Sequence, residues 1–227
     1  MQDYKSPLEM FYHWENETPN KLYMRQPING EWHHWTWSDT ATQVRKMAAY
    51  LKSLDFPANS KIATLSKNCA HWIISDLAIM MAGHVSVPLY PNLKAESIKQ
   101  ILEHSEAKFL FVGKLDDFES MRPGVPKDLP CVAFPFYSEE GYPVWDHLIK
   151  DVEPITENIV REPNELATII YTSGTTGMPK GVMHKFYNFS FATSNAVPLL
   201  GLATEERFFS YLPLRHIAER LLVEMGS

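Results

Sequence analysis

Apolar positions recur along this chain with two different periods, and each period predicts one kind of element. A helix over 38–54, with Ser38 as its N-cap, follows from four apolar residues that share one face: Val44, Met47, Ala48 and Leu51. The same reasoning predicts a helix at 70–83 that ends at Gly83, and another at 94–106. A short helix is expected within 140–151 and a helix of uncertain length at 184–201.

Shorter apolar runs between turn residues predict strands at 61–66, 85–90, 108–113, 131–134 and 166–173. Pro88 has no N–H group, so its strand is expected to end early or to lie at a sheet edge. The segment 152–165 is acidic, rich in proline and without periodicity, so it is the expected linker. Because strands alternate with helices, we expect an α/β fold with a mainly parallel β-sheet flanked by helices.

Composition narrows the class of protein. The 227 residues carry a formal net charge of −6, which disfavours a nucleic-acid-binding role because such a role needs a basic face. Cys69 and Cys131 lie far apart without metal-ligand spacing, which fits a reducing compartment. No signal peptide is visible, and the apolar stretch 71–90 contains Asp76 and His84, so it falls short of a membrane span. We therefore expect a cytoplasmic, globular protein.

The stretch IIYTSGTTGMPKGVMH, residues 169–184, places glycines, hydroxyl side chains and a lysine directly after an apolar run. Gly174 and Gly177 let the backbone approach a ligand, so that N–H and hydroxyl groups can converge on anionic oxygens. Lys180 adds a positive charge, and a helix after the loop would favour an anion at its N-terminus. This order predicts a phosphate site, although Gly/Ser/Thr clusters also occur as plain surface loops.

Two common nucleotide-binding motifs do not fit this stretch. A Walker loop needs glycine at the position of Pro179 and serine or threonine at the position of Gly181. The GxGxxG pattern fails because the residue two after Gly174 is Thr176. A P-loop NTPase or a Rossmann dehydrogenase is therefore disfavoured.

YTSGTTGMPKGV, residues 171–182, resembles the phosphate-loop signature of the adenylate-forming (AMP-binding) enzymes. Residues 35–54 look like the first helix of that family with its lead-in tryptophan. Residues 61–113 and SYLPLRHIAERLLVEMG, residues 210–226, are similar to the long-chain fatty acyl-CoA synthetase branch. The resemblance covers about residues 30–227.

This resemblance implies part of the large N-terminal domain of the acyl-CoA synthetase-like fold, and a two-step reaction. A fatty carboxylate attacks the α-phosphorus of ATP, which gives acyl-adenylate and pyrophosphate, and the thiol of coenzyme A then displaces AMP. ATP, Mg²⁺ and coenzyme A are the implied cofactor and substrates, with a long-chain fatty acid as the acid. The matching phosphate-binding residues are Thr172, Ser173, Gly174, Thr175, Thr176, Gly177 and Lys180. His216 matches a position beside the acyl and adenylate pocket, where it is expected to position groups rather than to act as a base.

Some features depart from the family pattern. His184 stands directly after GVM, where the family has a short linker before its histidine, and Arg215 replaces a small residue. The family's adenine and ribose motifs, its magnesium-binding glutamate and its mobile C-terminal domain lie beyond this chain. We therefore expect an N-terminal fragment that is inactive alone, with a lead-in (1–36), part of a first α/β subdomain (37–160) and an incomplete second one (161–227).

Two alternatives stay open at this point. The protein could be an adenylate-forming ligase for another carboxylate, or a non-catalytic module that binds a nucleotide or an acyl group. Acyl chain length, oligomeric state and contact with a membrane surface are not predicted by the sequence.

Four further clusters have a structural interpretation beside a functional one. The pair His33–His34 lacks further metal ligands and is interpreted as part of a strand or loop that packs its tryptophans. Asp116 and Asp117 are interpreted as a solvated loop end. Glu219 and Arg220 are interpreted as a surface charge pair. The alternative is a catalytic dyad, which the match to the family's Glu-Arg pair would support. A core is expected to contain Met80, Met81, Phe186, Tyr187, Phe189 and Phe191, with the floor of an acyl tunnel as the alternative.

Overall fold

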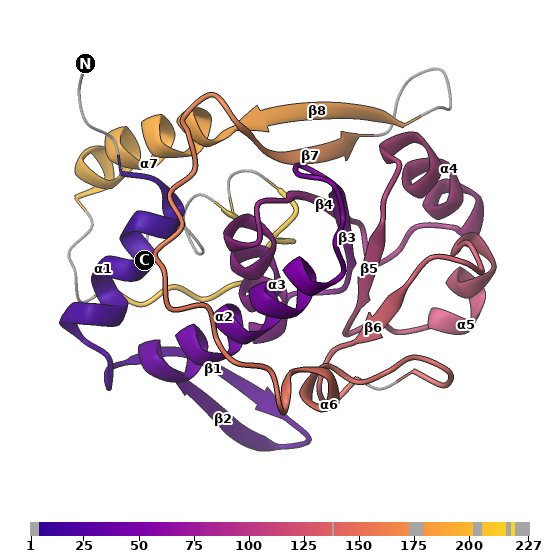
Figure 1. The fold of residues 1–227 in the computed structure, drawn as a ribbon, viewed down its shortest axis with the longest axis horizontal. Coiled ribbons are helices and arrows are strands. Elements are labelled where there is room, and N and C mark those ends of the chain that lie inside the picture. Colours follow the sequence, from indigo (N-terminus) through magenta and orange to yellow (C-terminus); the bar gives the residue numbers. More distant parts are fainter. Residues whose placement is uncertain (1–4, 138, 173–178, 202–205, 217–218, 221–227) are drawn as a thin grey trace.

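The computed structural model describes residues 5–137, 139–172, 179–201, 206–216 and 219–220. Its strands form a six-stranded sheet in the order β6-β5-β3-β4-β7-β8 and a two-stranded sheet of β1 and β2 (Figure 1). The strands are β1 (Leu22–Ile28), β2 (Glu31–Thr36), β3 (Lys61–Leu65), β4 (Val85–Leu89), β5 (Phe109–Val112), β6 (Cys131–Ala133), β7 (Leu166–Thr172) and β8 (Lys180–Lys185). The helices are α1 (Pro7–Glu17), α2 (Trp37–Ser53), α3 (Ala70–Met81), α4 (Ala95–Ser105), α5 (Phe118–Met121), α6 (Trp145–Ile149) and α7 (Phe186–Leu200), with a 3-10 turn at Arg122–Gly124.

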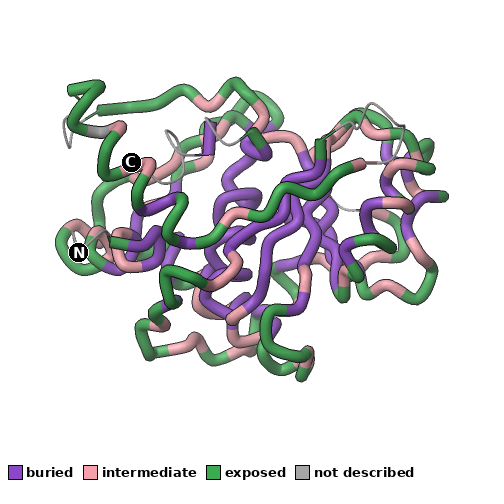
Figure 2. The backbone as a smooth tube through the Cα atoms, turned by 90° about the horizontal axis from the view of Figure 1, so that it is seen from above, coloured by how far each residue is buried: buried purple, intermediate pink, exposed green. Residues whose placement is uncertain are grey.

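The large sheet confirms the predicted α/β fold with a mainly parallel sheet flanked by helices. Strands β6, β5, β3, β4 and β7 are parallel to their neighbours, and β8 joins β7 antiparallel. Successive side chains point to opposite faces of a strand. Ile62 and Phe109 therefore pack with α2 and α3, whereas Ala63 and Leu110 pack with α4. Both faces are covered, and the buried backbone lies in the middle of the molecule (Figure 2).

Helix α2 has the predicted apolar face but a different N-cap. Thr36 caps the helix instead of Ser38, because its hydroxyl accepts the Asp39 N–H at 3.0 Å. The Asp39 carboxylate accepts the Thr36 N–H at 3.0 Å in return, and these bonds from Thr36 lower the pKa of Asp39. The four residues predicted to face inward, Val44, Met47, Ala48 and Leu51, are all fully buried.

Strand β4 contradicts the expectation drawn from Pro88. The strand lies between β3 and β7, and all its residues are buried. Val85 donates its N–H to Ser60 on the β3 side at 2.9 Å, and N–H direction alternates along a strand, so position 88 faces β7. The pairing of β4 with β7 is at Ser86 and Thr168, before Pro88 is reached. The missing donor is therefore tolerated in a central strand.

The glycine-rich stretch leads into a strand, whereas the sequence predicted that a helix would follow it. β7 and β8 form an antiparallel hairpin, and α7 begins only at Phe186, where Asn188 accepts the Lys185 N–H at 2.7 Å. The predicted helix at 184–201 thus starts two residues late. Because β8 separates the loop from α7, a helix N-terminus does not contribute to the predicted phosphate site.

The N-terminal region contains elements that the periodicity did not predict. Ser6 and Glu9 form a capping box at the start of α1, with Ser6 N–H donating to Glu9 at 2.7 Å. Asn29 and Gly30 have φ of 52° and 86°, which is typical of the tight turn that joins β1 and β2. His33 and His34 therefore lie in a strand, and the sequence had predicted a strand or a loop for them.

The predicted linker, residues 152–165, has neither helix nor strand and is tied to the core by two arginines. Arg45 donates to Ile155 O at 3.0 Å, and the buried Arg161 donates to Met80 O at 3.0 Å and Asn59 Oδ1 at 3.1 Å.

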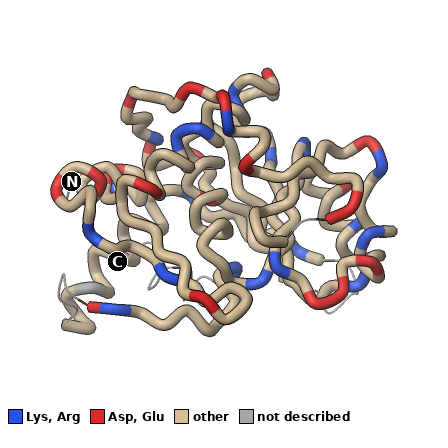
Figure 3. The backbone as a smooth tube through the Cα atoms, turned by 90° about the horizontal axis from the view of Figure 1, so that it is seen from below, with Lys and Arg blue, Asp and Glu red and all other residues tan. Residues whose placement is uncertain are grey.

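Basic and acidic residues are interspersed around the molecule in the view of Figure 3. No helix in the described part of the chain is both long and apolar enough to cross a membrane.

Candidate functional site

Strands β3, β4 and β7 are parallel, so their carboxyl ends lie at one edge of the sheet. In open α/β sheets this edge is the usual place for a ligand. Thr172 ends β7 at this edge and pairs across the hairpin with Lys180, the first residue of β8. The Thr172 hydroxyl lies 3.5 Å from Lys180 O, and both side chains are exposed. The hairpin thus presents a hydroxyl and a cation side by side at the base of the glycine-rich loop.

The structure brings together part of the predicted phosphate site. Thr172 and Lys180 are adjacent, as described above. The other predicted phosphate-binding residues lie outside the described part of the chain: Ser173, Gly174, Thr175, Thr176 and Gly177. Their role stays a prediction.

Tyr171 anchors the base of this hairpin. Its side chain is buried, and its hydroxyl lies 2.7 Å from His104 Nδ1 on α4. Burial raises the pKa of Tyr171, which keeps the phenol protonated and able to donate to His104. Opposite Tyr171 stands Gly181, where a Cβ atom would lie 2.8 Å from Ile169 Cγ2 and 3.2 Å from the Tyr171 ring. The glycine in the PKG triplet is therefore explained by close packing in the hairpin.

His216 lies at the same edge of the sheet, after the end of β4. Its ring is 5.8 Å from that of Tyr90, the residue that follows β4, with an interplanar angle of 72°. Beside it Arg215 is buried, contacts the Tyr90 ring and donates to Tyr171 O at 3.3 Å. Arg215 therefore lies under the edge and joins the ends of β4 and β7, while the exposed His216 faces outward.

Sequence reasoning gave no role to Asn68, three residues after β3. Its carboxamide bonds to three groups between Ser210 and Leu214, the segment that leads to His216. These partners lie more than 140 positions from Asn68 along the chain, so no local signal in the sequence could have indicated the contact.

Arg220 and Glu219 do not form the surface charge pair that was one interpretation of the sequence. Both are buried, and Arg220 pairs with the buried Asp76 in the middle of α3. Arg220 also lies over the rings of Trp72 and Phe189, at 5.5 Å and 5.2 Å from their centroids. This buried ion pair attaches the last described residues to the core of the domain.

His184 is not part of the carboxyl edge. It pairs with Thr168, well back along the hairpin, and its ring lies 6.1 Å from that of Phe189. Burial and then the charge of Arg220 lower the pKa of His184, which favours a neutral ring. The structure therefore places His184 in the packing between β8 and α7 rather than beside the loop.

The remaining clusters have structural roles. Asp116 forms an exposed ion pair with Lys67, and Asp117 caps α5 by accepting the Ser120 N–H at 3.1 Å. The predicted core residues divide into two groups. Buried ones are Met80, Met81, Phe186 and Phe189, whereas Tyr187 and Phe191 stack on each other and are 47% and 45% exposed.

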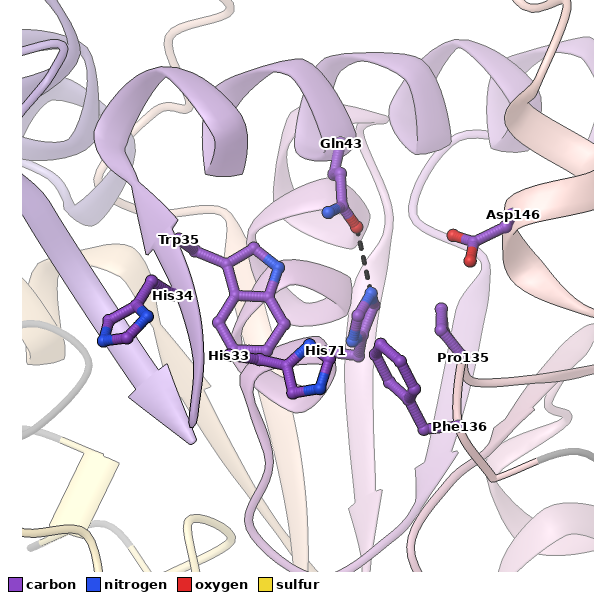
Figure 4. Close-up of a pocket in the computed structure, with 8 residues that line it drawn as sticks. All are labelled: His33, His34, Trp35, Gln43, His71, Pro135, Phe136 and Asp146. Carbon is purple, nitrogen blue, oxygen red and sulfur yellow. Dashed lines mark hydrogen bonds between the residues drawn. The ribbon is translucent and has the colours of Figure 1, made fainter. Parts of the chain in front are cut away.

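A separate pocket of about 150 Å³ is lined by residues from β2, α2, the start of α3, the segment after β6, and α6. Figure 4 shows Trp35 and His33 from β2 beside the ring of His71, with Phe136 and Asp146 on the opposite side. His71 Nε2 lies 2.9 Å from Gln43 Oε1 and donates to it, and burial lowers the pKa of His71 to about 3. Among the described residues, no group of three or more His, Cys, Asp or Glu side chains is placed to share a metal ion. This pocket is therefore not a metal centre built from those residues.

The chain can be compared with known proteins on this basis. Residues 11–227 match the family described as AMP-binding enzyme. A long-chain-fatty-acid–CoA ligase of Mycobacterium bovis is 30% identical over 223 residues, covering 94% of this chain and 37% of that protein. A 2-succinylbenzoate–CoA ligase of Bacillus licheniformis is 32% identical over 208 residues, covering 88% of this chain and 38% of that protein. The chain thus spans less than two fifths of the length of these relatives.

Solved structures share the fold at lower identity. An anthranilate CoA ligase in complex with anthranoyl-AMP aligns with a TM-score of 0.82 and 21% identity, over 100% of this chain and 45% of that one. The o-succinylbenzoate coenzyme A synthetase of Bacillus subtilis, in complex with ATP and magnesium ion, aligns with a TM-score of 0.75 and 22% identity. That alignment covers 95% of this chain and 53% of the other.

Proposed function

Because the chain belongs to the AMP-binding enzyme family, we propose that it supplies the triphosphate-binding part of a ligase that converts a long-chain fatty acid to its acyl-CoA. The observation that carries this proposal is the β7–β8 hairpin, which presents Thr172 and Lys180 side by side at the carboxyl edge of a parallel sheet. The choice of a long-chain acid is supported by the relative of that specificity, which is 30% identical. The 32% identical 2-succinylbenzoate ligase supports a second candidate acid.

In the proposed first step, a carboxylate oxygen bonds to the α-phosphorus of ATP. The bond between that phosphorus and the oxygen that bridges to the β-phosphate then breaks. Negative charge then accumulates on the leaving pyrophosphate. In this proposal the Lys180 ammonium and the Thr172 hydroxyl stabilise that charge, together with the donors of the loop between them. In the second step, the thiol sulfur of coenzyme A bonds to the acyl carbon and the bond from that carbon to the AMP oxygen breaks. AMP leaves with the electron pair, and the thiol proton passes to solvent.

His216 is proposed to orient the acyl and adenylate groups from the end of β4. The attacking group is already a carboxylate, so the first step needs no general base. Magnesium, which the resemblance implies, would be held largely by substrate phosphates and water, because Mg²⁺ usually takes only one or two carboxylates from a protein.

The test is a calorimetric titration of the 227-residue protein with ATP, in which Lys180→Ala is compared with Lys185→Ala. Both lysines are exposed and lie at opposite ends of β8, so they are matched in strand and environment. A hydrogen bond to a charged group is worth about 1.5–3 kcal/mol, so Lys180→Ala should weaken ATP binding about tenfold or more. Lys185→Ala should leave it unchanged. Equal effects of the two substitutions would contradict the assignment.

Adding a candidate acid and coenzyme A distinguishes the functional classes. We predict that the 227-residue protein forms no acyl-CoA by itself when ATP, palmitate and coenzyme A are all supplied. Acyl-CoA formation would show that this chain suffices for catalysis. If palmitate strengthens ATP binding and 2-succinylbenzoate does not, the result supports the long-chain acid. If 2-succinylbenzoate strengthens it and palmitate does not, the result favours the second candidate.

A further inference from the structure

The segment from Ser210 to His216 has neither a helix nor a strand, and the side chain of Asn68 makes three hydrogen bonds to it. Asn68 Nδ2 donates to Ser210 Oγ at 2.7 Å and to Leu212 O at 2.6 Å. Asn68 Oδ1 accepts the Leu214 N–H at 2.9 Å. A carboxamide offers two donor hydrogens and one acceptor oxygen, so both ends of this side chain are used on a single segment.

Asn68 is itself held firmly at the end of β3. The Ser66 hydroxyl donates to Lys67 O at 2.7 Å and accepts the Lys114 N–H at 2.9 Å. The Lys67 N–H donates to Lys114 O at 2.8 Å, which ties the ends of β3 and β5 together. The carboxamide therefore projects from a backbone that is fixed by its own bonds.

The three bonds of Asn68 end one residue before Arg215 and two before His216. Leu214, whose N–H bonds to Asn68, is 1% exposed. Directly after it, Arg215 donates to Tyr171 O, and the His216 and Tyr90 rings lie 5.8 Å apart in a T-shaped arrangement. The direction in which His216 leaves the sheet is thus set by the backbone that Asn68 holds.

We propose that Asn68 is the positioning residue of His216. It acts through the backbone of Ser210–Leu214 and holds His216 at the carboxyl ends of β4 and β7, next to the start of the glycine-rich loop. The meaning of that place for catalysis rests on the proposed function. The positioning itself does not, because it is a property of the protein without nucleotide.

The alternative is that packing of Leu214 and the bond from Arg215 hold the segment without Asn68. The two accounts differ in what the substitution Asn68→Ala does. If Asn68 positions the segment, the His216 ring leaves Tyr90 and the Leu214 amide loses its acceptor. If packing suffices, both stay in place.

The experiment uses NMR spectra of the 227-residue protein. An aromatic ring shifts the resonances of protons near its edge or face, and Tyr90→Leu identifies the part of the His216 ring shift that comes from Tyr90. We expect Asn68→Ala to remove at least half of the His216 chemical-shift contribution that comes from Tyr90. We also expect it to speed hydrogen exchange of the Leu214 amide at least tenfold. Ser210→Ala, which removes one of the three bonds, should move His216 in the same direction by less.

Asn188→Ala is the matched control. Asn188 also uses its side-chain oxygen on a backbone N–H, that of Lys185 at 2.7 Å, but at the start of α7. It should leave the His216 ring shift and the Leu214 exchange rate at their wild-type values. The proposal is overturned if Asn68→Ala, or Ser210→Ala should the former fail to fold, leaves both readouts unchanged as well.

These readouts need no ATP, so their outcome is separate from the titration of Lys180→Ala. A loss of ATP binding in Lys180→Ala with His216 unmoved by Asn68→Ala would keep the proposed function and reject the positioning role. Unchanged ATP binding in Lys180→Ala, with His216 moved by Asn68→Ala, would keep the positioning role and reject the proposed function.

Discussion

The buried ion pair between Asp76 and Arg220 allows a sharp test of how the C-terminal segment is attached. The Asp76 side chain is 2% exposed and that of Arg220 is 0% exposed. Asp76→Ala would leave the guanidinium in this interior, between the rings of Trp72 and Phe189, without its carboxylate. Removing one member of a buried pair costs about 3–5 kcal/mol, because the remaining buried charge loses its counter-charge.

That loss is large beside the total free energy of unfolding, which is about 5–15 kcal/mol for typical domains. Replacing both members by apolar residues avoids the isolated charge, and such replacements are often neutral. The double variant Asp76→Leu/Arg220→Met should therefore be more stable than Asp76→Ala alone. Asp116→Ala is the control, since Asp116 is 81% exposed in its pair with Lys67 and should cost less than about 1 kcal/mol.

The assay is urea unfolding at pH 7, followed by tryptophan fluorescence and by far-ultraviolet circular dichroism. His184 gives a second readout, because Arg220→Met removes a charge that lowers the pKa of His184, and that pKa should rise. Two results would refute the reasoning. One is an Asp76→Ala variant within 1 kcal/mol of the wild type, and the other is a double variant less stable than either single one.

Two further predictions concern stability. His71 has its pKa lowered by burial from 6.5 to about 3, so between these pH values the unfolded chain binds a proton that the folded protein does not. Stability should therefore fall as the pH drops below 6.5, with His71 contributing about 2 kcal/mol of the loss by pH 5. In urea unfolding, the His71→Gln variant should lose less stability between pH 7 and pH 5 than the wild type does. An equal loss in the two proteins would contradict the assignment. Gly124→Ala places a methyl group against the backbone of Ala95, which cannot move aside as a side chain can. It should lower the free energy of unfolding by about 1–3 kcal/mol, and an unchanged thermal midpoint would count against the packing seen there.

Much of the fold could be predicted because the central elements have strong periodicity. The apolar faces of α2 and α4 and the apolar runs of β3 and β5 all lie where the pattern predicted them, since these elements bury the residues that define the pattern. The local exceptions have local causes. Thr36 replaced Ser38 as the N-cap because Asp39 completes a capping box with it.

The position of Pro88 could not be predicted in the same way. Pro88 is tolerated in a central strand because the ladder to β7 stops before it, and the pairing of two strands distant in sequence is not visible in the periodicity of either.

The candidate site could be predicted in part. The glycine-rich motif indicated Thr172 and Lys180, and the structure makes them neighbours across a hairpin. The strand β8 was missed because the short stretch KGVMHK has too few residues to separate a strand from the first turn of a helix. Asn68 and Asp76 were missed because each acts on residues more than 140 positions away, and no local spacing records such a contact.

The central claim is that the hairpin from β7 to β8 binds the phosphates of ATP. The most direct measurement is a titration of the ¹⁵N-labelled protein with ATP, followed by amide chemical shifts. The largest saturable changes should fall on Thr172, Lys180 and the residues between them, with smaller ones at Tyr90 and His216. Changes confined to the pocket around His71, or none at ATP concentrations up to about 10 mM, which corresponds to binding weaker than about −3 kcal/mol, would contradict it.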